Sequence, residues 1–241
     1  MTGLSRYAIY FAAGSNSALS RFGAELLGYD AHTGNELPFP SDTLHAAPDW
    51  RDITADPRKY GFHGTLKAPM ALAPGKTEAE LLSACATFAG EARRIPVIRP
   101  IVDSISGFIA VIPAEPVDAL QELAADCVRE FDSFRPALTA EDRGRRKPEK
   151  LNERQRDYLD RWGYPYVMEE FRFHMTLTGR LDAERRGPIL KMLQARFAAL
   201  GLNTLAIDRV ALFRQGDAKA RFRIIGEWAL TQSSVSASSR D

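Results

Sequence analysis

The sequences YGFHGTLKAP (residues 60–69) and FRFHMTLTG (residues 171–179) contain the same pattern, Phe-His-x-Thr-Leu. Apolar and polar residues alternate in both segments, which is typical of a β-strand with one buried face. The two histidines, His63 and His174, lie more than a hundred residues apart. The sequence therefore predicts a duplicated unit whose two copies pack on each other.

The alternation also predicts which side chains share a face, because residues i and i+2 of a strand point the same way. The apolar faces of both strands are suited to a core. The polar faces have no use in a core, and they fit a solvent-filled cleft. These polar rows are His63, Thr65 and Lys67 in the first copy, and Arg172, His174, Thr176 and Thr178 in the second.

The pattern of the remaining chain predicts the order strand, helix, strand pair in each half. Strands are predicted at 6–12, 60–69, 171–179, 205–213 and 222–230, with two more between 95 and 112. Helices are predicted at 17–27, 77–92, 116–134, 152–162 and 182–200. The segment 29–58 is expected to be a long loop, 135–150 a basic connector and 231–241 a disordered tail.

Composition limits the classes of protein that fit. The chain has 241 residues, of which 45% are hydrophobic and 26% charged, and its formal net charge is +1. That size permits one large domain or two small ones, and the charge lacks the basic excess of a protein that wraps duplex nucleic acid. Cys85 and Cys127 lie in apolar helical patterns and are expected to be buried thiols, which suits a reducing cytosol. No apolar run is long enough to span a membrane, so a cytoplasmic location is expected.

Two histidines facing one space suggest phosphodiester chemistry. Opening a phosphodiester needs a base that takes a proton from the nucleophile and an acid that protonates the leaving oxygen. An imidazole with a pKa near 6.5 serves either role at neutral pH. Threonine hydroxyls can donate hydrogen bonds to the phosphoryl oxygens, and Lys or Arg can neutralise their charge.

These paired strands resemble the 2H phosphoesterase superfamily, which is named for two histidines in H-x-[ST] motifs on two pseudo-symmetric lobes. The wider segments, 60–69 and 162–166 followed by 171–179, are similar to the branch of that superfamily associated with phosphonate metabolism. The resemblance covers most of the chain, from the strand at 6–12 to the closing hairpin.

The resemblance implies an α+β fold with two pseudo-symmetric lobes, antiparallel sheets around a central cleft and helices on the outer faces. Residues 1–230 are then one bilobal domain, with motifs at 62–66 and 173–177. The implied activity is a cyclic phosphodiesterase that needs no metal or cofactor. Its substrate is a cyclic phosphate of a ribose-type sugar or nucleotide, with an intermediate of phosphonate degradation among the candidates. The motif assigns catalysis to His63, Thr65, His174 and Thr176.

Several neighbouring residues are candidates for binding the substrate. Lys67, Arg172 and Thr178 are candidates only because they share the polar faces of the two predicted strands. Tyr10 lies on the strand face that carries small residues, and a sugar or base could stack on it. An ordinary packed tyrosine is the alternative for Tyr10. The basic cluster at 143–150 is either a solvated connector or a contact to a second phosphate on the substrate. Because the two copies are so similar, the sequence leaves open which histidine is the acid.

Two other functions compete with this hypothesis. One is an RNA-end enzyme, a ligase or nuclease acting on 2′,3′-cyclic termini, which needs a long basic groove with exposed aromatic residues. The other is a module that binds a sugar phosphate or nucleotide without catalysis, which has no need of two proton-transfer groups. A zinc site does not fit, because the four histidines lack the local spacing of zinc ligands. The oligomeric state is open.

Overall fold

The computed structural model describes residues 5–233. Its strands are β1 (Arg6–Phe11), β2 (Gly64–Met70), β3 (Val97–Ile98), β4 (Pro100–Ile105), β5 (Phe108–Pro113), β6 (Met175–Thr176), β7 (Leu205–Ala206), β8 (Arg209–Gln215) and β9 (Arg223–Ala229). Seven of them form one sheet in the order β4-β5-β6-β2-β1-β8-β9, and β3 pairs with β7 separately. Adjacent strands of both sheets run antiparallel.

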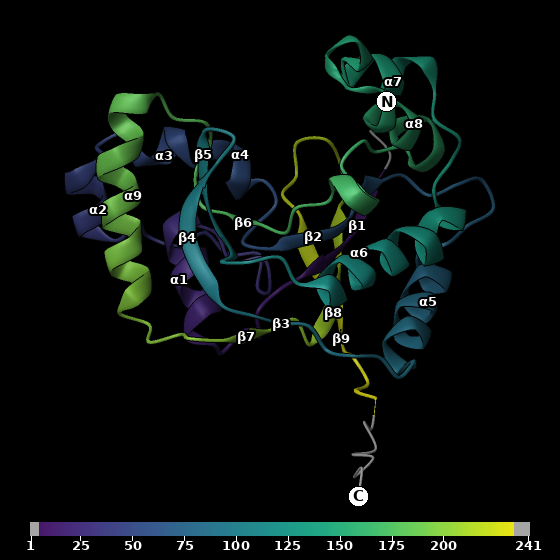
Figure 1. Ribbon diagram of the computed structural model, residues 1–241, viewed down its shortest axis with the longest axis horizontal. Coiled ribbons are helices and arrows are strands. Elements are labelled where there is room, and N and C mark those ends of the chain that lie inside the picture. The colour runs from purple at the N-terminus through teal and green to yellow at the C-terminus, as the bar shows by residue number, and fades with distance from the viewer. Residues whose placement is uncertain (1–4, 234–241) are drawn as a thin grey trace, which may run out of the picture.

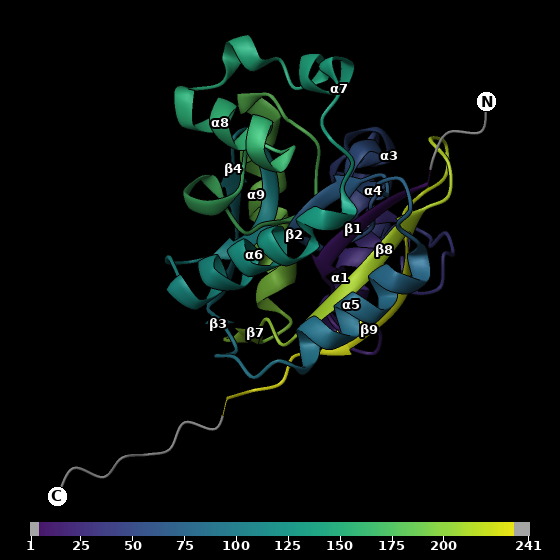
Figure 2. The same ribbon diagram turned by 90° about the vertical axis from the view of Figure 1, so that its right-hand side faces the viewer.

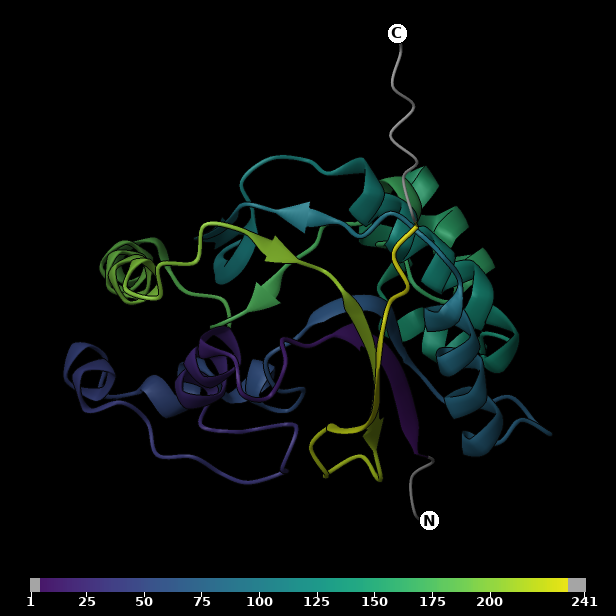
Figure 3. The same cartoon turned by 90° about the horizontal axis from the view of Figure 1, so that it is seen from below.

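The helices flank this sheet (Figure 1). They are α1 (Ala18–Leu27), α2 (Ser41–Ala46), α3 (Trp50–Ile53), α4 (Ala55–Arg58), α5 (Glu78–Gly90), α6 (Asp118–Glu130), α7 (Ala140–Arg145), α8 (Glu153–Trp162) and α9 (Ala183–Ala198). Helix α5 lies along β8 and β9, and α6 crosses β2 (Figure 2). Helix α9 packs on β4 at the other end of the sheet, so that seen from below the strands run between two groups of helices (Figure 3).

The apolar rows of the predicted strands form the core. Ile9, Leu66, Val111, Met175 and Leu212 are almost completely buried in one continuous hydrophobic cluster. The predicted α+β class with antiparallel pairing is therefore confirmed. Helix termini also follow the sequence signals: Thr77 and Glu80 form a capping box at the start of α5, and Gly163 ends α8 with a φ of 71°.

The two predicted lobes are halves of one continuous sheet. The motif strands β2 and β6 are direct neighbours, and they join the half that contains β4 and β5 to the half that contains β1, β8 and β9. Their contact is the antiparallel pair of Gly64 with Met175. At this central junction the sheets of the two predicted lobes continue into one sheet.

Some predicted elements differ in extent. The second motif strand, predicted over 171–179, is limited to Met175–Thr176, because its other residues make no ladder pairs with β2 or β5. The predicted loop 29–58 contains the short helices α2, α3 and α4, and the first strand predicted at 205–213 is split into β7 and β8. Two residues of the predicted tail, Thr231 and Ser233, hydrogen-bond with the backbone of Ala89 and Arg93. Residues 234–241 lie outside the described part.

No helix in residues 5–233 combines the length and the apolar character that crossing a lipid bilayer requires. Cys85 and Cys127 are free and buried, as their apolar surroundings predict.

Candidate active site

The junction of β2 with β6 brings the two motifs together. Because antiparallel strands run in opposite directions, the pairing of Gly64 with Met175 places His63 beside Thr176 and Thr65 beside His174. Each of these four residues is one position before or after Gly64 or Met175. Because neighbouring residues of a strand point to opposite faces, the four side chains lie on the face opposite to the buried Met175. Each histidine is thus next to the threonine of the other copy.

A cleft opens on this face, and it consists of two adjoining hollows. The larger has a volume of about 720 Å³ and is lined by His63, His174 and Thr176. The smaller, of about 430 Å³, is lined by Thr65 and again by His174. Both predicted catalytic pairs therefore face one cleft, and His174 stands at the boundary between its two hollows.

The ring of His63 is held in place on both sides. It stacks on Tyr10 of β1 with 3.8 Å between ring centroids and 20° between the ring planes. Its Nδ1 lies 2.8 Å from the carbonyl oxygen of Gly61. A carbonyl oxygen only accepts, so Nδ1 carries the hydrogen and donates it. The other nitrogen, Nε2, is therefore unprotonated and basic, and it can accept a hydrogen bond from Thr65 Oγ1, which lies 3.2 Å away.

His174 repeats this arrangement. Its Nδ1 donates to the carbonyl oxygen of Arg172 at 2.7 Å, again two residues earlier in the chain. The centroid of its ring is 5.4 Å from that of Phe108, which also lines both hollows. In both copies the backbone thus holds one tautomer, which leaves Nε2 free for proton transfer.

Burial determines the protonation state of His63 and His174. It lowers the pKa of His63 to about 4, and the nearby His174 adds to the lowering, while the hydrogen bond to Gly61 opposes it. Burial also lowers the pKa of His174, with the hydrogen bond to Arg172 acting against it. Desolvation disfavours the charged imidazolium, so both rings are neutral at pH 7 in the free protein.

Lys67 does not continue the polar row of His63 and Thr65, so that prediction is wrong. Tyr10 pairs with Thr65 but Ile9 pairs with Lys67, which leaves Leu66 as an extra residue in β2. This β-bulge reverses the alternation, because residues that pair across a ladder share a face. Lys67 is consequently on the core face with Ile9 and is only 4% exposed.

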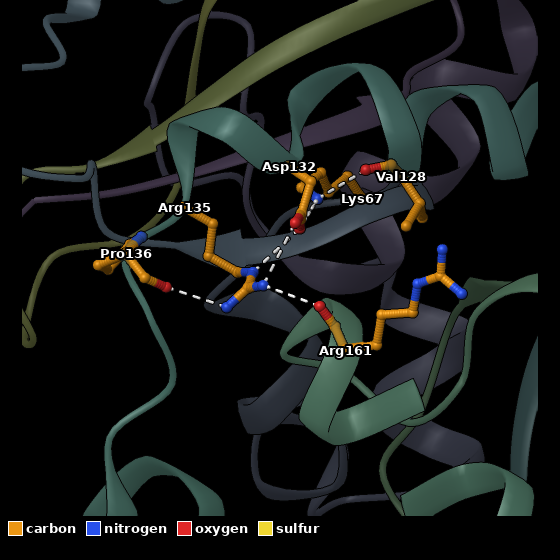
Figure 4. Close-up of polar contacts among 6 residues, drawn as sticks. All are labelled: Lys67, Val128, Asp132, Arg135, Pro136 and Arg161. Carbon is orange, nitrogen blue, oxygen red and sulfur yellow. Dashed lines mark hydrogen bonds and ion pairs between the residues drawn. The ribbon is translucent and has the colours of Figure 1, made fainter. Parts of the chain in front are cut away.

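The ammonium of Lys67 is occupied by partners on the far side of the sheet (Figure 4). Its Nζ donates to the carbonyl oxygen of Val128 at 3.0 Å and to Asp132 Oδ1 at 3.2 Å. Asp132 also accepts from Arg135, whose guanidinium reaches the carbonyl oxygens of Pro136 and Arg161. Lys67 therefore anchors α6 and the turn that follows it to β2.

The other predicted binding residues have different surroundings. Arg172 is exposed and lines the smaller hollow beside His174. Thr178 lines the larger hollow, but its buried hydroxyl donates to Gly179 O and accepts from Ile109 N, so it stabilises the turn after β6. Tyr10 is 1% exposed and its ring lies against His63, so that face is not open to a sugar or base.

Sequence reasoning missed several residues of the cleft. Arg180, Phe108 and Tyr60 line it, and Arg180 lines both hollows. Arg180 directly follows the predicted strand 171–179, so extending that segment by one residue would have included it. Asp52 and Asp56, from α3 and α4, lie at the larger hollow, and Asp56 forms an ion pair with Lys59 at 3.0 Å.

The remaining histidines lie elsewhere. His45 is exposed and hydrogen-bonds to Ser41 O, and His32 lies 3.5 Å from Glu227, which raises its pKa. Among residues 5–233, no three or more His, Cys, Asp or Glu side chains are grouped as metal ligands.

Fold and cleft together define a mixed α/β protein whose antiparallel sheet carries two facing His–Thr pairs. The chain belongs to the family described as "Protein of unknown function (DUF1045)", whose model matches residues 65–223.

Two curated relatives are named "Ribose 1,5-bisphosphate phosphokinase PhnN". The relative from Janthinobacterium sp. (strain Marseille) is 36% identical over 222 residues, which cover 88% of this chain and 48% of the relative. The one from Laribacter hongkongensis (strain HLHK9) is 33% identical over 237 residues, which cover 96% of this chain and 53% of the relative. The chain thus spans about half the length of the curated relatives it matches.

Solved structures give a more distant likeness. E. coli LigT complexed with NADP+ is 15% identical, with a TM-score of 0.40 over 96% of this chain and all of the other. A structure described as a phosphoesterase is also 15% identical, with a TM-score of 0.38 over 95% of this chain and 99% of the other.

Proposed function

We propose that this protein is a phosphodiesterase that hydrolyses a cyclic phosphate of a ribose-type sugar or nucleotide, with His63 and His174 as general base and general acid. The observation that carries the proposal is the shared cleft, in which each histidine has its Nδ1 held by a backbone carbonyl oxygen, keeps Nε2 for proton transfer and lies beside the threonine of the other copy.

The different surroundings of the two rings assign their roles. His63 is the more deeply packed, under Tyr10, and its pKa of about 4 keeps it unprotonated at neutral pH, as a base must be. Burial also lowers the pKa of His174, but its hollow is open to Arg172 and Arg180. A bound phosphate anion raises the pKa of a nearby imidazole, so His174 becomes the proton donor once substrate is in place.

The reaction then needs no group from outside the cleft. His63 Nε2 takes a proton from a water molecule as its oxygen bonds to phosphorus. The phosphorus–oxygen bond to the sugar breaks, and His174 Nε2 gives its proton to the departing oxygen. The product is a phosphomonoester, and exchange with solvent returns both histidines to their starting states.

The other side chains of the cleft would stabilise the transition state. Thr65 and Thr176 can donate hydroxyl hydrogens to the non-bridging oxygens, and Arg180 can neutralise the charge that builds up on them. In the free protein Thr65 hydrogen-bonds to His63 Nε2. Substrate binding would release the hydroxyl from this contact and leave the nitrogen to the attacking water.

The relatives agree with a ribose phosphate as the substrate class. Their name includes a ribose bisphosphate, although this chain corresponds to only about half of their length. The motif resemblance adds phosphonate degradation as the setting, and a cytoplasmic enzyme fits that setting.

A product assay tests the proposal. We expect the protein to convert at least one member of a panel of ribose 1,2-cyclic and nucleoside 2′,3′-cyclic phosphates to a phosphomonoester, monitored by phosphorus NMR. Turnover is expected to be undiminished in EDTA. Activity that disappears in EDTA and returns with a divalent metal would contradict the His–His mechanism. Binding of a cyclic phosphate without turnover would instead favour a sugar-phosphate binding module.

A further inference from the structure

The hydroxyl groups of the tyrosines divide into two kinds. Of the seven tyrosines in the chain, three donate their hydroxyl hydrogens to protein acceptors: Tyr7, Tyr29 and Tyr158. Tyr10, Tyr60 and Tyr164, which we call the tyrosine cluster, are buried or half-buried, but within residues 5–233 their hydroxyls have no hydrogen-bond partner. Buried hydroxyls nearly always have a partner, so three unpaired ones beside one cleft indicate a site for a ligand.

The tyrosine cluster surrounds the first His–Thr pair. Tyr10 pairs with Thr65 across the ladder of β1 and β2, and its ring stacks on His63 with 3.8 Å between centroids. The ring centroid of Tyr60 is 6.0 Å from that of His63, and Tyr60 lines the larger hollow. Tyr164 lines the smaller hollow together with Thr65. Each hollow of the cleft therefore has one tyrosine of the cluster in its wall.

Packing against neighbouring side chains holds these rings in place. Tyr60 stacks on Phe222 with 5.2 Å between centroids and 19° between the ring planes, and Phe222 is buried 6.4 Å from Tyr10. The guanidinium of Arg146 lies 5.1 Å from the ring centroid of Tyr164. Because the rings are already ordered, their hydroxyls lose little conformational freedom when a ligand binds.

The hydroxyls of the cluster act on one another and keep their hydrogens. Burial, and then Tyr60 and Tyr164, raise the pKa of Tyr10 well above its usual value. Burial is also the main cause that raises the pKa of Tyr164; Arg146 opposes it, and Tyr166 and Tyr60 add to it. Protonated phenols are hydrogen-bond donors. The cluster therefore offers donors, and no negative charge, to a ligand in the cleft.

The positive charge of the cleft comes from a different wall. Arg180 follows β6 and lines both hollows beside His174. Strands β6 and β1 lie on opposite sides of β2, and Tyr10 belongs to β1. A phosphate held between the two histidines thus has Arg180 on one side and the tyrosine cluster on the other. Its two non-bridging oxygens point in different directions, so one of them faces the cluster.

We propose that Tyr60 and Tyr164 are further catalytic residues, whose hydroxyls donate hydrogen bonds to the non-bridging phosphoryl oxygen that faces away from Arg180. This proposal rests on the proposed function and adds two donors to it. Negative charge builds up on the non-bridging oxygens as water adds to phosphorus, and donors already aimed at that charge stabilise the transition state. Tyr10 lines neither hollow, so it is a positioning residue that packs behind the two donors.

The test uses a nucleoside 2′,3′-cyclic phosphate and the two diastereomers of its phosphorothioate, in which sulfur replaces one or the other non-bridging oxygen. The double variant Tyr60→Phe, Tyr164→Phe is expected to lower kcat on the phosphate at least about tenfold, with KM within threefold of wild type. Sulfur is a weak acceptor, so the loss should be at least fivefold smaller for one diastereomer and unchanged for the other. Tyr158→Phe is the matched control, because the hydroxyl of Tyr158 is paired with Glu169, and its kinetics should equal those of the wild type.

Equal losses on the phosphate and on both diastereomers, or no loss on any of them, would overturn the proposal, because a merely structural role does not distinguish one oxygen from the other. If the wild type turns over no cyclic phosphate, the proposed function is wrong, and binding of orthovanadate then tests the tyrosines. Orthovanadate adopts the five-bonded geometry of the transition state, and calorimetry should show at least fivefold weaker binding by the double variant than by wild type and Tyr158→Phe. Equal binding by all three proteins refutes the role of Tyr60 and Tyr164.

Discussion

Gly64 of β2 pairs with Met175 of β6, and this pair joins the two copies of the motif. The pairing depends on the missing side chain of Gly64. A Cβ at this position would lie 2.4 Å from the ring of Phe173, a buried residue of the second motif. The two strands can approach each other, and bring the histidines to one cleft, because residue 64 is a glycine.

Gly64→Ala is therefore expected to separate β2 from β6. Overpacking of this kind costs about 1–3 kcal/mol of stability, and the displacement of His63 relative to His174 should lower kcat/KM more than tenfold. Urea unfolding and turnover measure the two effects. Gly90→Ala is the matched control, since no atom lies within 4 Å of a Cβ at Gly90. Full activity in Gly64→Ala would show that the close approach of the strands is not needed.

Removal of either imidazole should abolish turnover without unfolding the protein. His63→Ala and His174→Ala are each expected to lower kcat by at least about 10²–10⁴-fold, the usual contribution of general acid–base catalysis. His45→Ala and His32→Ala, which alter histidines away from the cleft, should retain activity. Circular dichroism establishes that the variants are folded. A His63→Ala protein with half of the normal activity would exclude His63 as the base.

The pH dependence of kcat/KM follows from the lowered pKa values. The productive free enzyme has His63 unprotonated and His174 protonated, and both groups titrate below their usual value near 6.5. The profile should be bell-shaped with its maximum below pH 6.5, and its acid limb should lie near the His63 pKa of about 4. Tyr10→Leu removes the stacked ring and admits water, which should raise the pKa of His63 and move the acid limb to higher pH. A maximum above pH 7.5 would contradict these assignments.

The stability of the fold should decrease on acidification because the imidazole of His63 is buried. Between pH 6.5 and about 4 the unfolded chain binds a proton at His63 and the folded chain does not. The free energy of unfolding then falls as pH falls, by up to about 1.4 kcal/mol per pH unit from this group. His63→Gln should show a shallower loss over this range in urea titrations at several pH values. Parallel curves for the two proteins would mean that His63 is charged in the folded state.

Lys67 gives a contrasting case, because its ammonium lies on the core side. Lys67→Ala should leave kcat and KM within twofold of wild type. It should destabilise the fold by about 1–3 kcal/mol, since the Val128 carbonyl loses a buried donor. Asp132 retains its contact with Arg135, which limits the loss. A large increase in KM without a change in stability would show instead that Lys67 binds the substrate.

Periodicity was sufficient to predict the helices and most strands, and the repeated motif was sufficient to predict that His63 and His174 share a cleft. Periodicity failed for Lys67. Alternation assumes an uninterrupted strand ladder, and the extra residue at Leu66 reverses the alternation from that point on. No local pattern marks that bulge. It follows from how β1 and β2 fit together, which is a long-range property.

The pairing of the basic cluster at 143–150 was beyond sequence reasoning for a similar reason, because only the fold decides which acidic residues its members meet. Arg143 and Arg145 find acidic partners, and Arg146 remains without one among the described residues.

The crossing of the motifs at Gly64 and Met175 has the geometry of a local twofold axis, since it relates His63 and Thr65 to His174 and Thr176. Neither half contains a complete site, because each histidine is completed by the other half. A polypeptide with one such motif would obtain the same cleft by pairing with an identical copy, as isologous dimers do. Joining two copies in one chain frees them to diverge, and the packing of Tyr10 against His63 is a difference that such a fusion permits.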